Sequence, residues 1–259
     1  MKIILIGRGK MGRLLKETAL AAGDEVVAML GSDDLHKLAD MEKADVVIDF
    51  SRPEALDAVC AYVRRTGTAL LSGTTGYTAE EKAKLNALGA HAPVLWSANY
   101  SLGVAVLYRA LRVVSDVLKK DFDIEIVETH HNQKADAPSG TAKLLLEAID
   151  PAHAMTPVYG REGNTGKRTK EEIGMHALRG GTVAGTHAVH FFGLDEELEF
   201  THRAGSRQIF VSGALHMARL LPGKANQVYD RALFADGALS AARFLSGKPA
   251  GMYQMKDLI

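Results

Sequence analysis

The sequence predicts an α/β protein in which a Rossmann-like, doubly wound parallel sheet is followed by a second α+β domain with a mixed or antiparallel sheet. Three observations predict this fold. A Gly-x-Gly-x-x-Gly sequence at residues 7–12 lies between an apolar and an amphipathic segment. Strand-like and helix-like segments then alternate up to residue 101, as in parallel sheets. In residues 173–202, three strand-like segments follow one another without helices between them, which indicates a different architecture.

Each element of the first half has its own pattern. Residues 2–6 (KIILI) and 25–30 (EVVAML) read as buried strands, and residues 10–22 between them carry apolar side chains at helical spacing up to a stop at Gly23. The remaining elements predicted here are strands at 45–50, 68–72 and 93–97 and helices at 53–65 and 78–89.

The second half begins with a long predicted helix, after which strands and polar loops replace the regular alternation of strands and helices. Residues 123–129 (DIEIVET) alternate like a half-buried strand and lead into a polar loop at 130–141. In the tail, residues 206–229 and 230–253 form a near-repeat, each copy predicted as an amphipathic helix ended by Gly-Lys. The other predicted elements are helices at 103–119 and 142–149, a Gly-rich polar loop at 160–168, and strands at 173–179, 183–192 and 197–202.

Composition excludes several classes of protein. The chain has 259 residues, is 47% hydrophobic and balances 31 Lys and Arg against 31 Asp and Glu, so neither disorder nor nucleic-acid binding is expected. A single cysteine, Cys60, rules out a disulfide framework and a cysteine-rich metal site. No apolar run has membrane-spanning length, and we expect a cytoplasmic protein without a membrane partner.

The glycine-rich turn at residues 7–12 indicates dinucleotide binding. Glycine permits the tight turn and a close approach of the backbone, and the following helix start offers N–H groups and a positive dipole end to a pyrophosphate. Segments 49–51, 73–76 and 98–101 each follow a predicted strand, so they share the sheet edge where such folds bind ligands. The alternative for each segment is a plain turn.

The loop at 130–141 has the densest chemistry. His130, His131 and Lys134 lie within five residues of one another, and residues 138–141 (PSGT) open a helix whose N–H groups favour an anion. This pattern predicts acid/base catalysis beside a bound carboxylate. A structural loop is the main alternative. A metal site is not expected, because adjacent histidines on a strand point to opposite faces and no HExxH pattern is present.

These residues resemble the 4-hydroxy-tetrahydrodipicolinate reductase (dihydrodipicolinate reductase) family of lysine and diaminopimelate biosynthesis. The resemblance covers nearly the whole chain and is most specific at 128–142 (E-x-H-H-x-x-K-x-D-A-P-S-G-T-A). Further matching motifs are GxGKMG at 7–12, DFSxP at 49–53, GTTG at 73–76, ANYSLGV at 98–104, GRxGxTGxR at 160–168, ALRGGTVAGTH at 177–187, THRAxSR at 201–207 and the tail GMYQMKDLI.

The resemblance implies that NADH or NADPH reduces a cyclic dicarboxylate imine to tetrahydrodipicolinate. It implies an acid/base role for His130 and a proton-donor role for Lys134. It also implies a homotetramer assembled through the second domain, with C-terminal residues returning to the nucleotide-binding domain. The implied substrate-carboxylate contacts are His131, Lys134, Ser139, Gly140 and Thr141. The implied cofactor contacts are Gly7, Arg8, Gly9, Lys10, Met11, Gly12, Gly73, Thr74, Thr75, Ala98, Asn99 and Tyr100.

Two departures from the family pattern refine these expectations. The second strand ends Met-Leu-Gly-Ser at 29–32 rather than in an acidic residue, and Asp33 and Asp34 come slightly late, so we expect both nicotinamides to be accepted with a lean toward NADPH. The tail holds two copies of a segment that the family has once. We therefore predict a dinucleotide-binding domain from residues 1–101 and 206–259, and a substrate-binding and oligomerisation domain from residues 102–205.

Two rival functions remain at this point. Another two-domain dehydrogenase of an amino-acid-derived substrate predicts the same first hundred residues but leaves the 130–142 segment unexplained. A nicotinamide-sensing regulator needs an output module such as a DNA-binding helix-turn-helix, for which the sequence shows neither the helix pattern nor a basic patch.

Overall fold

The computed structural model describes residues 1–229. Its described residues divide into two compact units: 1–97 with 215–229, and 98–214. The predicted return of the C-terminal residues to the first domain, like the second copy of the tail repeat, lies outside the described residues. The domain bounds and their separate functions therefore stay predictions.

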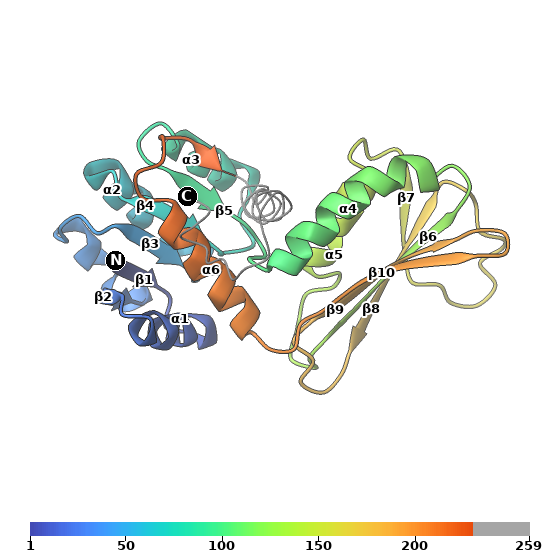
Figure 1. Ribbon diagram of the computed structural model, residues 1–259, viewed down its shortest axis with the longest axis horizontal. Coiled ribbons are helices and arrows are strands. Elements are labelled where there is room, and N and C mark those ends of the chain that lie inside the picture. Colours follow the sequence, from blue (N-terminus) through green and yellow to red (C-terminus); the bar gives the residue numbers. More distant parts are fainter. Residues whose placement is uncertain (230–259) are drawn as a thin grey trace, which may run out of the picture. The chain divides into compact units, whose positions relative to one another are not determined.

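The first unit holds a six-stranded sheet that is parallel throughout, in the order β11-β5-β4-β3-β1-β2 (Figure 1). This confirms the doubly wound sheet, and all five strands predicted for it are present. Its strands are β1 (Lys2–Ile6), β2 (Glu25–Leu30), β3 (Val46–Asp49), β4 (Ala69–Ser72), β5 (Val94–Trp96) and β11 (Val228–Tyr229).

The helices of this unit begin and end where local signals predict. Helix α3 (Ala79–Leu88) opens with a capping box in which Thr78 and Glu81 bond each other's backbone N–H. Helix α2 (Leu56–Thr66) ends at Gly67, whose φ of 65° is the left-handed conformation glycine favours. The unit also contains α1 (Lys10–Ala21) and two short 3₁₀ helices, η1 (Ser32–Ala39), which was not predicted, and η2 (Pro53–Ala55).

The apolar core of the first unit lies between these helices and the sheet. The strands β1, β3 and β4 are buried along their apolar residues, as the continuous hydrophobic runs of a parallel sheet require. β1 has β2 on one side and β3 on the other, so the strand order reverses beside it. In open α/β sheets, the carboxyl ends of the strands at such a point form the ligand crevice.

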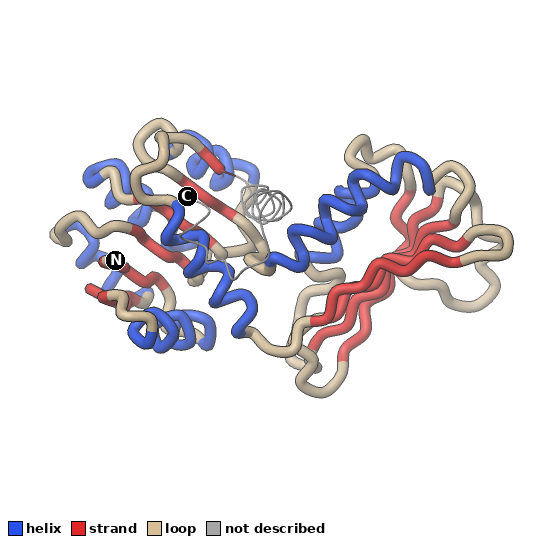
Figure 2. The backbone as a smooth tube through the Cα atoms, viewed as in Figure 1, coloured by secondary structure: helices blue, strands red, loops and turns tan. Residues whose placement is uncertain are grey.

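The second unit has a five-stranded mixed sheet in the order β10-β9-β6-β8-β7. Figure 2 shows the strands in red and the helices in blue. The pairs β6–β8 and β7–β8 are parallel, whereas β6–β9 and β9–β10 are antiparallel, which confirms a mixed sheet. The strands are β6 (Asp123–His130), β7 (Thr156–Tyr159), β8 (Glu172–Arg179), β9 (Thr186–Phe192) and β10 (Glu197–Arg203).

Two helices, α4 (Leu102–Leu118) and α5 (Gly140–Ile149), pack on one face of this sheet. Ile124 and Ile126 of β6 meet Leu111 of α4 and Leu145 of α5 in a core whose members are fully buried. Strand alternation then continues along β6, so that Glu128 and His130 follow on the same face as the two isoleucines. The polar site of this unit is therefore built at the end of its apolar core.

Helix α6 (Gln208–Leu220) is the first helix of the tail repeat, and it ends before Gly223 rather than running to it. After it, β11 adds a two-residue parallel strand beside β5. Among the described residues, no helix combines the length and the apolar character needed to cross a membrane.

Candidate active site

The glycine-rich loop after β1 leaves no room for side chains at two of its positions. Gly7 has a φ of 107°, and a Cβ there would lie 2.4 Å from the carbonyl oxygen of Phe50. A Cβ on Gly12, inside α1, would lie 1.9 Å from the carbonyl oxygen of Gly7. The helix start therefore rests directly on the loop. Its N-cap residue, Gly9, offers no side-chain bond to the first N–H groups of α1, which stay available to a pyrophosphate.

A cavity of about 710 Å³ opens beside this loop. Gly7, Arg8 and Gly9 contribute to its wall, which continues along Gly31–Asp33 after β2 and along Phe50–Arg52 after β3. It lies at the carboxyl ends of the strands, where the strand order reverses. Its size and donors fit a nucleotide held by the loop, so the residues present fit the implied nicotinamide cofactor.

Arg8 meets an acidic partner at the cavity. Its guanidinium forms an ion pair with Asp34, and its Nε donates to the carbonyl oxygen of Met29 at 3.3 Å. The Gly31 N–H also bonds Asp34, at 2.7 Å, and with Arg8 it holds the pKa of that carboxyl below its ordinary value. Asp34 is therefore engaged within the protein, while Asp33 lines the cavity itself.

A buried carboxylate, Asp49, ties together the loops that follow β3 and β4. It is 1% exposed and accepts hydrogen bonds from the Ser51 hydroxyl at 2.5 Å and the Thr74 hydroxyl at 2.9 Å. Ser72 and Tyr77 add hydroxyl donors, each at 3.2 Å. Burial raises its pKa, against the opposing effect of these donors. The predicted contact Thr74 thus has a structural partner, whereas Thr75 beside it is exposed.

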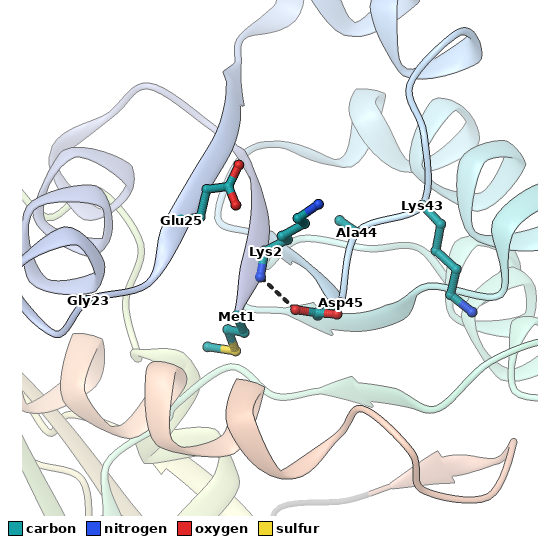
Figure 3. Close-up of a pocket in the computed structure, with 7 residues that line it drawn as sticks. All are labelled: Met1, Lys2, Gly23, Glu25, Lys43, Ala44 and Asp45. Atoms are coloured by element: carbon teal, nitrogen blue, oxygen red, sulfur yellow. Dashed lines mark hydrogen bonds between the residues drawn. The ribbon is translucent and has the colours of Figure 1, made fainter.

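A second cavity of the first unit, of about 540 Å³, lies at the opposite ends of the strands (Figure 3). Lys2 and Lys43 stand there among Glu25 and Asp45, and the Lys2 N–H donates to Asp45 at 2.6 Å. Because ligands of doubly wound sheets bind at the carboxyl ends, this amino-end cavity is not the candidate site.

In the second unit, the start of α5 is built as the sequence predicted. Ser139 is the N-cap, and its Oγ accepts the N–H of Ala142 at 3.2 Å. Thr141 Oγ1 accepts a hydrogen bond from Asn99 Nδ2 at 2.8 Å. Asn99, predicted as a cofactor contact, therefore stands beside a predicted substrate contact, and Ala98 lies near Gly140. Tyr100 is buried.

His130 ends β6 and contacts Glu128 on the same face of that strand. The two are joined by a 2.5 Å hydrogen bond between His130 Nδ1 and Glu128 Oε2. Arg179 of β8 bonds both oxygens of Glu128, at 2.8 and 3.0 Å. Burial alone would raise the pKa of Glu128, but the bonds from Arg179 and His130 bring it below its ordinary value, so the carboxylate is ionised.

Two histidines approach the helix starts from the sheet, of which His187 is buried and His202 half-buried. His187 of β9 places Nε2 3.1 Å from the Ser139 hydroxyl, and His202 of β10 places Nε2 3.1 Å from the hydroxyl of Ser101, the N-cap of α4. Burial, and next the charge of His130, lower the pKa of His187 to about 3. The His187 and His130 rings lie edge to face, 5.1 Å apart.

Lys134 lies in the loop between β6 and α5, with its Nζ 2.7 Å from Asp136 Oδ1. Its backbone N–H bonds the carbonyl oxygen of His131 in a tight turn. The structure thus places the predicted His130, His131, Lys134 and 139–141 segment around one loop. Within residues 1–229, no three His, Cys, Asp or Glu side chains gather as ligands for a metal ion.

Sequence reasoning missed three residues of this cluster: Glu128, Arg179 and His187. One signal was available, because residues 128 and 130 of a strand share a face. The others come from neighbouring strands, through the register that pairs Glu128 with His187 and His130 with Arg179.

Comparison with known proteins covers both units. Residues 1–100 match the protein family described as "Dihydrodipicolinate reductase, N-terminus", and residues 103–230 match "Dihydrodipicolinate reductase, C-terminus". A 4-hydroxy-tetrahydrodipicolinate reductase of Clostridium tetani is 40% identical over 243 residues, which cover 89% of this chain and 95% of that protein. One of Methanobrevibacter smithii is 42% identical over 207 residues, covering 78% of this chain and 76% of that protein.

A solved structure has the same fold. The dipicolinate-bound dihydrodipicolinate reductase from Paenisporosarcina sp. TG-14 superimposes with a TM-score of 0.71 at 22% identity, covering 89% of this chain and 97% of that one. At this identity, the similarity supports the fold alone.

Proposed function

The chain belongs to the dihydrodipicolinate reductase family, and we propose that it carries out the family's reaction with His130 and Lys134 as its proton-handling residues. It is an oxidoreductase of lysine biosynthesis, a 4-hydroxy-tetrahydrodipicolinate reductase that uses NAD(P)H. The observation that carries the residue assignment is the loop between β6 and α5, which contains Lys134 and joins His130 to the start of α5. We further propose that the enzyme acts in the cytoplasm.

The reaction divides between the two units in this proposal. The first unit would hold the reduced nicotinamide nucleotide, which supplies a hydride when bound, through the 7–12 loop and the 73–75 segment. The second unit would hold the dicarboxylate substrate through its 130–141 loop. Domain functions thus follow the predicted division into a dinucleotide-binding and a substrate-binding domain.

The proton must reach the ring as negative charge develops toward its nitrogen. The Nδ1 atom of His130 is hydrogen-bonded to Glu128, which leaves Nε2 for proton exchange with the substrate or with water. Lys134 carries three N–H donors on a flexible side chain and can hold a carboxylate while it gives a proton. Its present partner, Asp136, is an exposed carboxylate, so a substrate carboxylate can take that place.

The substrate carboxylates would bind at the start of α5. Gly140 and Thr141 present the first N–H groups of a ten-residue helix whose N-cap is Ser139, and His131 adds a further donor. Gly140 offers no side chain, so a carboxylate can approach the backbone there. Fixing both carboxylates would orient the ring toward the hydride donor.

His130→Ala and Lys134→Ala test the assignment. Each should lower kcat by about 10²-fold or more in an assay of nicotinamide oxidation with freshly made substrate. Cofactor affinity should stay within a few-fold, because both residues lie outside the dinucleotide loops. Lys143 is an exposed lysine of α5, the helix that begins at the proposed carboxylate-binding residues 139–141. Lys143→Ala is therefore the matched control and should keep wild-type kcat. Near-wild-type kcat in both alanine variants would contradict the assignment.

For the cofactor, we propose that both NADH and NADPH are accepted, with a lean toward NADPH. The cavity wall carries Arg8 and Arg52, which can meet a 2′-phosphate, and Asp33, which can bond a 2′-hydroxyl. Asp34 does not add repulsion, because Arg8 and the Gly31 N–H engage it.

The ratio of kcat/KM for the two cofactors measures this preference. Arg52→Ala should lower kcat/KM for NADPH more than for NADH, while Arg13→Ala, on the exposed side of α1, should leave the ratio unchanged. A preference for NADH of about a hundredfold or more would mean that the ribose contacts are misplaced.

We propose a homotetramer assembled through the sheet of the second unit. The face of that sheet opposite α4 and α5 exposes Leu178 and Phe192, at 49% and 40% of their surfaces, where an apolar interface would cover them. Sedimentation of the wild type should give a tetramer, and Leu178→Lys with Phe192→Lys should dissociate it. Val113→Lys, on the exposed side of α4, is the control. A monomeric wild type would contradict the proposal.

A further inference from the structure

The side chain of Glu128 is the most enclosed charge of the second unit. It is 1% exposed, and four N–H groups surround its two oxygens. His130 Nδ1 lies at 2.5 Å, the Ser139 N–H at 3.1 Å, and the two terminal nitrogens of Arg179 at 2.8 and 3.0 Å. These donors come from three segments of the chain: the end of β6, the start of α5 and the end of β8.

A buried carboxylate is costly unless its charge is balanced and its oxygens are bonded. Arg179 balances the charge, and the four donors fill the acceptor positions of both oxygens. An ionised carboxylate can only accept hydrogen bonds, so the proton of the short contact with His130 lies on Nδ1. Glu128 thereby selects one tautomer of the neutral imidazole, the one whose Nε2 carries a lone pair.

The other ring nitrogen of His130 lies beside Gly185. A Cβ at position 185 would lie 3.1 Å from His130 Nε2, and Gly185 supplies none. Its φ of 153° also disfavours a side chain. Of the two ring nitrogens, one is therefore held by a fixed carboxylate and the other faces the space that a glycine leaves.

The same carboxylate also fixes the carboxylate-binding end of the loop. Its Oε1 accepts the N–H of Ser139, the N-cap of α5. Arg179, while bonded to Glu128, donates to the carbonyl oxygen of Asp136 at 2.7 Å, within the loop that carries Lys134. The buried Glu128–Arg179 ion pair thus connects the His130 ring, the loop that carries Lys134 and the start of α5.

We propose that Glu128 is the positioning residue of this site: it sets the tautomer of His130 and holds His130 and the α5 start in fixed relation, with Arg179 as its counter-ion. The proposal rests on the proposed acid/base role of His130. Glu128 acts through His130 and exchanges no proton with the substrate itself.

Glu128→Gln is the first test. The amide presents an NH₂ group to donors that need an acceptor, so we expect kcat to fall about 10- to 100-fold, as for other residues that orient a functional histidine. The pKa read from the pH dependence of kcat should move down, because the lost carboxylate no longer stabilises the imidazolium. Among residues 1–229, Arg179 and His187 are further titratable or charged groups beside this pair, and the substitution removes neither.

The control is a second glutamate on the same strand. Glu125 lies on the other face of β6, 2.6 Å from His176 Nε2, and is bonded by Arg161 and Arg168. Glu125→Gln removes the same charge from a similar Glu–His–Arg cluster. It should leave both kcat and its pH profile at wild-type values, whereas a purely structural effect of losing a charge on β6 would affect both variants.

A double-mutant cycle separates this inference from the proposed function. In a His130→Ala background, Glu128→Gln should change kcat less than about twofold, because its effect on kcat passes through the absent ring, whereas its bond to the α5 start acts on substrate KM. An equal loss with and without His130 would overturn the positioning role while the loss caused by His130→Ala alone still supports the acid/base assignment. If His130→Ala itself keeps kcat, the acid/base assignment fails and the positioning role fails with it.

A measurement on the wild type keeps the proposal testable should Glu128→Gln not fold. The ¹⁵N chemical shifts of the two ring nitrogens of His130 distinguish the two neutral tautomers. The His130 signals are assigned by their absence from spectra of His130→Ala, with Lys143→Ala as the control variant that keeps them. We expect the Nδ1–H tautomer at pH values above the titration of the ring. A dominant Nε2–H tautomer would overturn the proposal.

Discussion

The Ser139 hydroxyl lies 3.1 Å from His187 Nε2, and the same oxygen accepts the N–H of Ala142. Because the pKa of His187 is lowered to about 3, its ring is neutral at working pH and Nε2 can accept the serine proton. The Ser139 hydroxyl, at the N-cap of α5, is therefore oriented by a hydrogen bond to an uncharged imidazole. His187 adds no positive charge that would compete with the other cations of the site.

The first prediction concerns acid stability. The unfolded chain binds a proton at His187 near the ordinary pKa of 6.5, but the folded chain does so only near 3, so the contribution of this residue falls as pH decreases from 6.5 toward 3. His187→Leu should therefore lose less unfolding free energy than the wild type between neutral pH and about pH 5, measured by urea unfolding. His36→Leu, at an exposed position, should keep the wild-type dependence. Parallel curves for His187→Leu and wild type would contradict the prediction.

The second prediction concerns Thr141. Thr141→Val removes the acceptor of the 2.8 Å hydrogen bond from Asn99 and a hydroxyl from the carboxylate cradle. The substrate KM should rise about five- to tenfold, as expected for one hydrogen bond, while kcat stays within about threefold. Steady-state kinetics with varied substrate measure both. An unchanged KM would place the substrate carboxylate elsewhere.

The third prediction compares two glycines of one loop. Gly7→Ala would force a Cβ to 2.4 Å from the Phe50 carbonyl oxygen at a φ of 107°, and we expect a loss of about 2 kcal/mol or more in unfolding free energy. At Gly9 no atom lies within 4 Å of an added Cβ, and φ is −72°, so Gly9→Ala should keep wild-type stability. Its effect should be a higher cofactor KM, because the methyl group stands where a pyrophosphate would approach. Equal stability of the two variants would refute the prediction.

The fourth prediction concerns Asp49. Asp49→Asn places an NH₂ group among hydroxyl donors from the loops after β3 and β4, so we expect a loss of about 1–3 kcal/mol and a higher cofactor KM. Asp45→Asn is the control, since Asp45 is exposed and accepts the Lys2 N–H at the far end of the sheet. Thermal unfolding and cofactor titration check both variants. Equal effects at the two positions would show that the Asp49 network does not hold the loops.

Much of this fold was predictable because its elements carry local signals. The strands of the first sheet are continuous apolar runs, and the starts of α3 and α5 have capping residues that the sequence displays. β7 was missed because it is a four-residue edge strand containing Pro157, which the patterns of longer strands do not describe. β11 has two residues and is defined by its pairing with β5 rather than by its own pattern.

The candidate site was predictable only along the chain. His130, Lys134 and the 139–141 segment lie within one motif, so their proximity follows from sequence distance. Arg179 and His187 join them through strand register, which depends on how β8 and β9 pair with β6. Register is fixed by packing over the whole sheet, and one residue of slip would send both side chains to the other face.

The paired serine–histidine contacts at the two helix starts have a consequence for inhibitor design. Ser101 with His202 and Ser139 with His187 fasten α4 and α5 to adjacent strands through bonds that need no ligand. A rigid, planar dicarboxylic acid would therefore meet hydrogen-bond donors that are already in position. Its binding would cost little free energy for ordering side chains of the enzyme. Flexible analogues of equal charge would have to lose their own torsional freedom on binding, so potency in this enzyme should follow the stiffness of the compound more closely than its number of polar groups.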